Sequence, residues 1–158
     1  MKGTFIFVFS LLLPSCAQPH PNHINPIFAP IYIQFQHDAA AIGVHFDADR
    51  SLTIQFANLG YNPKTTGAEI VGECQSQSDN RGYNNTISID PVFWDNATVD
   101  EQWLLVYHEL GHCVLGAGHT ANPDDIMYPD IGVNISVWHN EHWKSIDGLF
   151  RSYEGRLL

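Results

Sequence analysis

The stretch His108–Thr120, HELGHCVLGAGHT, holds three histidines and one glutamate. His108 and His112 are four residues apart, so on a helix their side chains leave the same face about one turn from each other. Neutral imidazole nitrogen is a ligand that zinc accepts readily. The spacing therefore predicts two metal ligands, and it raises the question of whether His119 supplies a third.

Glu109 directly follows the first histidine and lies one step around the same helix. A carboxylate in this place can reach a water on the metal without being a ligand itself. The pattern H-E-x-x-H therefore assigns two ligands and a general base. The pattern is short, however, and a helix with two ordinary histidines is the alternative interpretation.

The residues around this pattern predict a helix over 99–116, VDEQWLLVYHELGHCVLG. Asp100 and Glu101 fall in its first turn, where the helix dipole favours negative charge. Gly116 or Gly118 would end the helix, because glycine adopts the left-handed conformation that commonly follows a last turn.

The segment 108–129, in which DDIMYP follows the histidines, resembles the metzincin superfamily of zinc peptidases and, within it, the matrixin-like branch. In that family a glycine turns the chain so that a third histidine reaches the zinc, and a methionine-containing turn, called the Met-turn, lies beneath the metal. Gly116, His119 and Met127 match these features. The resemblance implies an α+β, metzincin-like zincin fold: a small twisted mixed sheet with an N-terminal helix, an active-site helix and a C-terminal helix.

The resemblance also implies a function, that of a zinc-dependent endopeptidase. One catalytic zinc would be held by His108, His112 and His119, with Glu109 as the general base. The substrate would be an extended peptide or protein segment that pairs with an exposed strand edge, which by resemblance lies in AEIVGECQ, residues 68–75. YPDIGV, after the methionine, would wall the pocket for the residue that follows the cut.

The spacing departs from the family by one residue. Family members usually place the glycine seven and the last histidine ten residues after the first histidine, whereas Gly116 and His119 come eight and eleven after His108. The interval from glycine to histidine is kept, so the extra residue falls before the turn. The helix can absorb it with one more residue before its end or with a local bulge.

Two other interpretations stay open. In a different class of zinc peptidase, the gluzincins, a glutamate on a later helix is the third ligand. The segment NEHWKSID offers Glu141, but Ser145 stands where that class normally has an aspartate. The other interpretation is a non-catalytic zinc-binding exported lipoprotein, although a site that only binds zinc has no need of Glu109.

Residues 1–16 have the layout of a signal peptide of the lipoprotein type. One lysine precedes an apolar run that is too short to cross a bilayer as an anchor helix. LPSC resembles a bacterial lipobox, in which Cys16 would carry the lipid and tether the protein to a membrane. Ordinary cleavage after Ala17 is the rival. Both interpretations export the protein, either as a lipoprotein of the outer membrane, periplasm or cell surface, or as a secreted protein.

Export makes the other two cysteines informative. In an oxidising compartment Cys74 and Cys113 are an even pair and a disulfide candidate. Two buried free thiols are the alternative.

The rest of the chain predicts a single domain. Residues 17–26 are rich in proline and asparagine and predict a spacer, and residues 27–158 then form the metallopeptidase domain. The polar, turn-rich segment SQSDNRGYNN, residues 76–85, predicts a loop. Apolar spacing and runs of branched residues predict helices and strands: helices over 27–43 and 136–155, and strands over 52–60, 68–75 and 85–91.

Composition limits the partners. The chain of 158 residues carries 17 acidic against 7 basic residues, a formal charge of -10. This argues against nucleic acid, which requires clustered lysine and arginine. We expect a monomer that acts on peptide or protein substrates. Calcium is possible but no motif supports it, since the candidate carboxylates have no calcium-loop spacing: Asp47, Asp49, Asp124 and Asp125.

Overall fold

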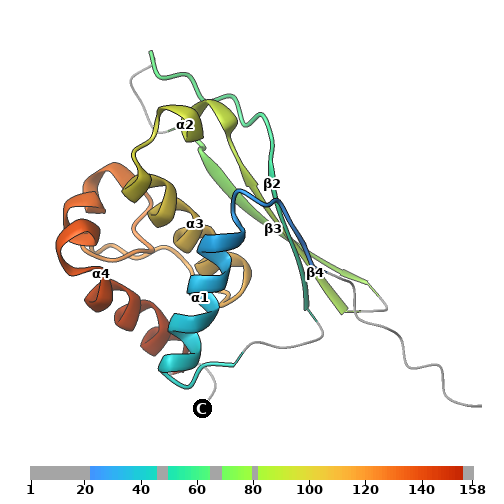
Figure 1. The fold of residues 1–158 in the computed structure, drawn as a ribbon, viewed down its shortest axis with the longest axis vertical. Helices are drawn as coiled ribbons and strands as arrows, with labels where there is room; N and C mark the ends of the chain where they lie inside the picture. Colours follow the sequence, from blue (N-terminus) through green and yellow to red (C-terminus); the bar gives the residue numbers. More distant parts are fainter. Residues whose placement is uncertain (1–21, 46–49, 65–68, 80–81, 155–158) are drawn as a thin grey trace, which may run out of the picture.

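Figure 1 shows the computed structural model, which describes residues 22–45, 50–64, 69–79 and 82–154. Along this part of the chain the elements are β1 (His23–Ile24), α1 (Ala29–Ala41), β2 (Arg50–Phe56), β3 (Gly72–Asp79), β4 (Gly82–Ile89), α2 (Pro91–Asn96), α3 (Val99–Cys113) and α4 (Ile131–Glu154). The strands form one sheet, and α1, α3 and α4 lie on one side of it. This is the α+β arrangement that the sequence predicts. The proposed signal peptide, with Cys16, lies outside the described residues.

The sheet is mixed and has the strand order β1-β2-β4-β3. β1 runs parallel to β2, and β2 runs parallel to β4, whereas β3 and β4 pair as an antiparallel hairpin. β3 therefore forms one edge of the sheet. At the other edge His23 pairs with Thr53, so the sheet begins inside the segment 17–26 that the sequence predicts to be a spacer.

The prediction of a loop over 76–85 is wrong, because β3 and β4 both continue into this segment. Ser76 pairs with Asn85, and Ser78 pairs with Tyr83. The side chains from Gln75 to Ser78 are exposed, so this end of the hairpin can be polar while its backbone groups stay hydrogen-bonded to each other. The composition marks this segment as exposed to water, but exposure does not exclude a strand.

The core lies between the sheet and the helices, with α3 at its centre. α3 contacts β3 and β4 on one side and packs against α1 and α4 on the other. The rings of Phe35 in α1 and Tyr107 in α3 pack edge to face, with 5.3 Å between their centroids. The Tyr107 hydroxyl donates a buried hydrogen bond of 2.6 Å to Asp38. The helix that carries two of the histidines is thus fixed from several sides.

The helices differ from the prediction at their boundaries. α1 has Pro30 in its first turn, as predicted, and is followed by Gly43, whose φ is +87°. α4 begins at Ile131 rather than near residue 136, and it kinks at Glu141, whose φ is −136°. α2 has no counterpart in the prediction. Among the described residues no helix combines the length and the apolar character that a membrane span requires.

Candidate metal centre

α3 begins with a capping box that fixes the start of the helix. The Thr98 side chain accepts the N–H of Glu101, and the Glu101 side chain accepts the N–H of Thr98. These reciprocal bonds satisfy two N–H groups that the helix itself leaves without partners. From Leu104 to Gly111 every residue is buried, so His108 and Glu109 lie on a helix whose position is set by the core.

The three histidines of the stretch converge on one point. The Nε2 atom of His112 lies 3.1 Å from that of His108 and 3.1 Å from that of His119, and the His108 and His119 Nε2 atoms are 3.2 Å apart. Zn–N bonds of about 2.0–2.1 Å at tetrahedral angles place their nitrogens about 3.3 Å from each other. The three imidazoles therefore fit one zinc ion, with a fourth position left for another ligand.

The other ring nitrogens are held by backbone carbonyls. Nδ1 of His108 lies 2.7 Å from the Ile126 carbonyl oxygen, and Nδ1 of His112 lies 2.6 Å from that of Ala117. A carbonyl only accepts, so each Nδ1 carries the proton and each Nε2 presents a lone pair to the other rings. Burial lowers the pKa of His108 to about 4 and lowers the pKa of His112 as well. Neutral rings with converging lone pairs are the donor set that a metal cation requires.

A widened last turn of α3 absorbs the additional residue before the third histidine. The Leu115 N–H reaches back five residues to the Leu110 carbonyl, and the Ala117 N–H reaches back six to the Gly111 carbonyl. Bonds longer than the usual four-residue step are typical of a bulge. Gly116 follows with a φ of +61°, a conformation that favours glycine. Of the two ways to absorb the residue, the structure therefore has the bulge.

Met127 lies beneath the helix that carries the histidines. It is buried, and a methyl group added to Gly111 would overlap the Met127 sulfur, so the glycine of H-E-L-G-H allows this close packing. The Met127 carbonyl accepts the N–H of Thr120, the residue after His119. The Met127 N–H donates to the Asp125 carboxylate at 2.8 Å. The turn thus supports the segment that carries the third histidine.

Glu109 lies beside the histidines in a buried position. Its side chain is 3% exposed, and its Oε2 is the one buried side-chain oxygen or nitrogen without a hydrogen-bond partner in the described part of the chain. Burial, together with the charge of Glu73, raises the pKa of Glu109 to about 8. Both residues line a cavity of about 640 Å³ with the three histidines. A carboxylate without a partner in such a cavity is available for chemistry.

Gly72 at the start of β3 allows the sheet edge to approach Glu109. A Cβ at this position would lie 2.6 Å from Glu109 Oε1 and 2.7 Å from Leu105 Cδ1. Gly72 and Glu73 lie in the segment 68–75 that the sequence predicts as the substrate edge, but the sequence does not mark either residue as part of the metal site. No local pattern marks them, because their role arises from the packing of β3 against α3.

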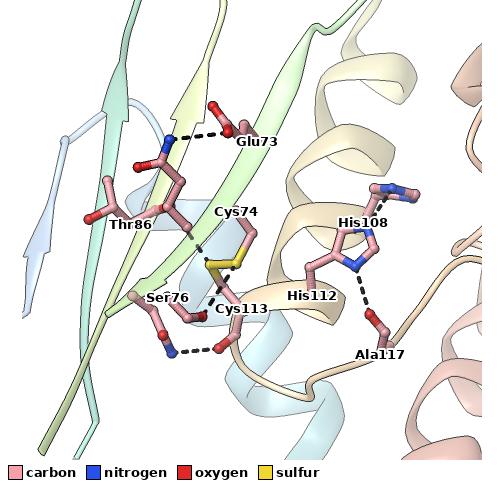
Figure 2. The surroundings of a disulfide bond; sticks show 10 residues. Glu73, Cys74, Ser76, Thr86, His108, His112, Cys113 and Ala117 are labelled. Atoms are coloured by element: carbon pink, nitrogen blue, oxygen red, sulfur yellow. Dashed lines mark hydrogen bonds between the residues drawn. A yellow bond between two sulfur atoms is a disulfide. The ribbon is translucent and has the colours of Figure 1, made fainter. Parts of the chain in front are cut away.

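The disulfide prediction is confirmed. Cys74 of β3 and Cys113 at the end of α3 are bonded, with their Cα atoms 5.5 Å apart. Figure 2 shows the bond beside His112, from which Cys113 is one residue away. Asn85 of β4 also donates to the Cys113 carbonyl at 2.6 Å. The edge strand and the metal-binding helix are therefore joined next to the histidine cluster.

The structure does not bring the other candidates to this site. Glu141 pairs with Lys144 on the exposed side of α4 at 2.9 Å, so the interpretation with a glutamate as third ligand is wrong. Asp124 is exposed, and Asp125 bonds to the Met-turn. Among the described residues the three histidines form the one group that could hold a metal ion. Asp47 and Asp49 lie outside the described residues.

Comparison with protein families gives a match over most of the chain. Residues 27–150 match the family model of the matrixins. Comparisons with curated proteins and with solved structures gave no match. The matched region contains the three converging histidines, Met127 and the strands β2, β3 and β4 of the mixed sheet. The chain belongs to the matrixin family and is a zinc metallopeptidase.

Proposed function

We propose that this chain is an endopeptidase in which Glu109 is the general base. The supporting observation is the position of its carboxylate, which is buried, has an oxygen without a partner and lines the same cavity as the histidines. In the reaction Glu109 takes a proton from the attacking water and returns it to the leaving amine. The bond between the carbonyl carbon and the amide nitrogen breaks, and the water oxygen becomes part of the new carboxylate.

The histidines His108, His112 and His119 would hold the metal. Zinc, when bound, acts as a Lewis acid on the carbonyl and lowers the pKa of water. The carbonyl oxygens of Ile126 and Ala117 hold the first two rings in the orientation and protonation state that this binding needs. The histidines would therefore hold the metal in place, whereas Glu109 moves the proton.

The pKa of Glu109 suits this task. Burial, together with the charge of Glu73, raises the pKa of Glu109 to about 8, so loss of its proton is costly unless a positive charge is nearby. Beside a cation held by the histidines, Glu109 would be stabilised in its ionised form, which is the form that accepts a proton. A general base works best with a pKa near the working pH, because it must both take and return the proton.

The substrate would lie along β3. This strand is an edge of the sheet, and residues from Glu69 to Cys74 line the cavity. A peptide in an extended conformation can add to such an edge by backbone hydrogen bonds, which do not depend on the sequence of the peptide. Ile70 at this edge is 62% exposed, so it offers an apolar contact to a bound peptide.

Substitution of Glu109→Gln tests the proposal, because it keeps the shape of the side chain and removes the base. We expect kcat to fall by about 10²–10⁴-fold, while the zinc content of the protein stays equal to that of the wild type. Cleavage of a peptide mixture, followed by mass spectrometry, measures the activity. A non-catalytic zinc protein would show no cleavage in either form, and an active Glu109→Gln protein would contradict the assigned role.

A further inference from the structure

A second cavity adjoins the catalytic cavity. The first, of about 640 Å³, is lined by the histidines, and the second, of about 480 Å³, shares four lining residues with it: Glu69, Val71, Pro129 and Ile131. We call the second cavity the acidic compartment, and its other wall residues include Tyr61, Phe93, Glu101 and Asp130. The acidic compartment therefore lies next to the catalytic cavity, where a side chain of a bound peptide would extend past the shared residues into it.

The carboxylates of the acidic compartment come from three separate parts of the chain. Glu69 precedes β3, Glu101 lies in the first turn of α3, and Asp130 follows the Met-turn. None of the described residues that line the compartment is a lysine, an arginine or a histidine. The charged residues of the compartment are therefore all acidic. The fold brings them together from separate segments, since they do not form a continuous acidic run in the sequence.

Two of these carboxylates keep an oxygen for a ligand. Glu101 uses Oε2 for the cap on Thr98 at 2.7 Å, and Asp130 uses Oδ1 to accept the N–H of Gly132 at 3.0 Å. Within the described part of the chain, Glu101 Oε1 and Asp130 Oδ2 have no hydrogen-bond partner. Two negatively charged groups can thus accept hydrogen bonds from a cation.

The remaining walls are apolar and aromatic. Tyr61 and Phe93 meet edge to face at 5.5 Å between ring centroids, and Val71 and Ile131 line the side toward the catalytic cavity. Lysine and arginine have long apolar stems that pack on such surfaces while the charged end stays polar. Aromatic rings also attract cations through their faces. Apolar walls combined with carboxylates match a long basic side chain and disfavour an acidic one.

We infer that the acidic compartment binds a lysine or arginine side chain of the substrate, and that the enzyme selects peptides with a basic residue close to the cut bond. This inference rests on the proposed peptidase function. It adds a substrate class to it, cationic peptides, which neither the metal site nor the strand edge determines.

Fluorogenic peptides that differ in one residue test the inference. At each of the three positions on either side of the cut bond, lysine, arginine, norleucine and glutamate are compared in turn. Norleucine has an apolar stem like that of lysine and no charge. At one position we expect kcat/KM for lysine or arginine to exceed that for norleucine by about tenfold, since a hydrogen bond between charged groups is lost with norleucine. Glutamate is expected to be the poorest residue there.

The variant Asp130→Asn tests whether the preference for a basic residue arises from the acidic compartment. Asparagine keeps an oxygen for the Gly132 N–H and removes the charge, so we expect the ratio of kcat/KM for lysine to that for norleucine to fall several-fold. Glu101→Gln, which keeps an oxygen for the Thr98 cap, is a second variant with the same expected result. Asp124→Asn removes an exposed carboxylate that lines neither cavity, and it should leave the ratio unchanged.

The outcomes distinguish failure of this inference from failure of the proposed peptidase function. Equal kcat/KM for lysine and norleucine at every position overturns the inference, even if all the peptides are cut. An unchanged ratio in both Asp130→Asn and Glu101→Gln overturns it as well. If zinc-loaded protein cuts no peptide at all, the proposed function fails and this inference fails with it.

Discussion

At the scale of single residues, two glycines make room for the site. Gly111 allows Met127 to pack beneath α3, and Gly72 allows β3 to approach Glu109. Neither has a positive φ, so their value here is the absence of a side chain rather than an unusual backbone conformation. Any larger residue at either position must displace a side chain of the site.

Gly72→Ala should impair catalysis more than stability. The added methyl group would lie 2.6 Å from Glu109 Oε1, so the carboxylate must move. A displacement on the order of 1 Å in a reacting group costs about 10²-fold in rate, and we expect a fall of about 10–100-fold in kcat. Steady-state kinetics on a cleaved peptide measures it, with zinc content as a second measurement that should not change.

Gly148→Ala is the matched control for this substitution. Gly148 lies in α4, and an added methyl group would meet no atom within 4 Å. The control should leave kcat unchanged. Equal kcat for Gly72→Ala and the wild type would show that a side chain at the edge of β3 does not displace the Glu109 carboxylate.

At the scale of secondary-structure elements, Asp90 joins α2 to the segment after β2. It is 1% exposed, and its carboxylate accepts N–H groups from Val92 at 2.8 Å in α2 and from Leu59 at 2.8 Å. Burial alone would raise the pKa of Asp90, but the backbone N–H groups that donate to it lower the pKa below its usual 3.8. The helix α2 therefore depends on an ionised carboxylate.

The contribution of Asp90 to stability should disappear in acid. Because the pKa is lower in the folded than in the unfolded state, the unfolded chain takes up the proton first as the pH falls, and stability is lost through the folded pKa. Above pH 5 we expect Asp90→Asn to unfold with about 1–3 kcal/mol less free energy than the wild type. The difference should shrink below the usual pKa of 3.8. Urea unfolding at a series of pH values measures it.

Asp95→Asn is the control for Asp90, because Asp95 lies in the same helix and its side chain is exposed. Its substitution should change the free energy of unfolding by less than about 0.5 kcal/mol. A constant difference between wild type and Asp90→Asn at all pH values would contradict the account of the cap.

The disulfide joins two elements that are 39 residues apart in sequence. A cross-link over this distance lowers the entropy of the unfolded chain, which corresponds to about 4 kcal/mol of stability in the loop-entropy description. The double variant Cys74→Ser and Cys113→Ser should therefore unfold at a lower urea concentration. Because the bond also holds β3 against α3, we expect KM for peptides to rise. Unchanged stability on removal of the bond would show that other contacts already hold β3 in place.

The elements also show what the sequence can predict. α3 and its histidines were predictable, because the acidic first turn, the helical spacing and the glycine that follows the helix are local signals. The hairpin of β3 and β4 was not, since its polar residues depend on pairing between strands for their structure. α2 was also missed, although Asp90 followed by Pro91 is a local signal for the start of a helix.

At the scale of the whole molecule, the site lies where the sheet edge, α3 and the Met-turn meet. The disulfide fixes the strand to the helix, Met127 supports the helix from below, and the bulge after Cys113 directs His119 to the other two rings. The ligand set was predictable from the sequence, but the carbonyl oxygens that orient the rings were not. Ile126 and Ala117 have no side-chain signal for this role, because the acceptors belong to the backbone.

The central claim is that three imidazoles bind one zinc ion. X-ray absorption at the zinc edge of the purified protein tests it directly, with zinc content measured on the same sample. We predict about one zinc per chain, with three histidine nitrogens at about 2.0–2.1 Å, and loss of one of these in His119→Ala. A site with two histidines, a sulfur ligand, or a spectrum unchanged by His119→Ala would contradict the account.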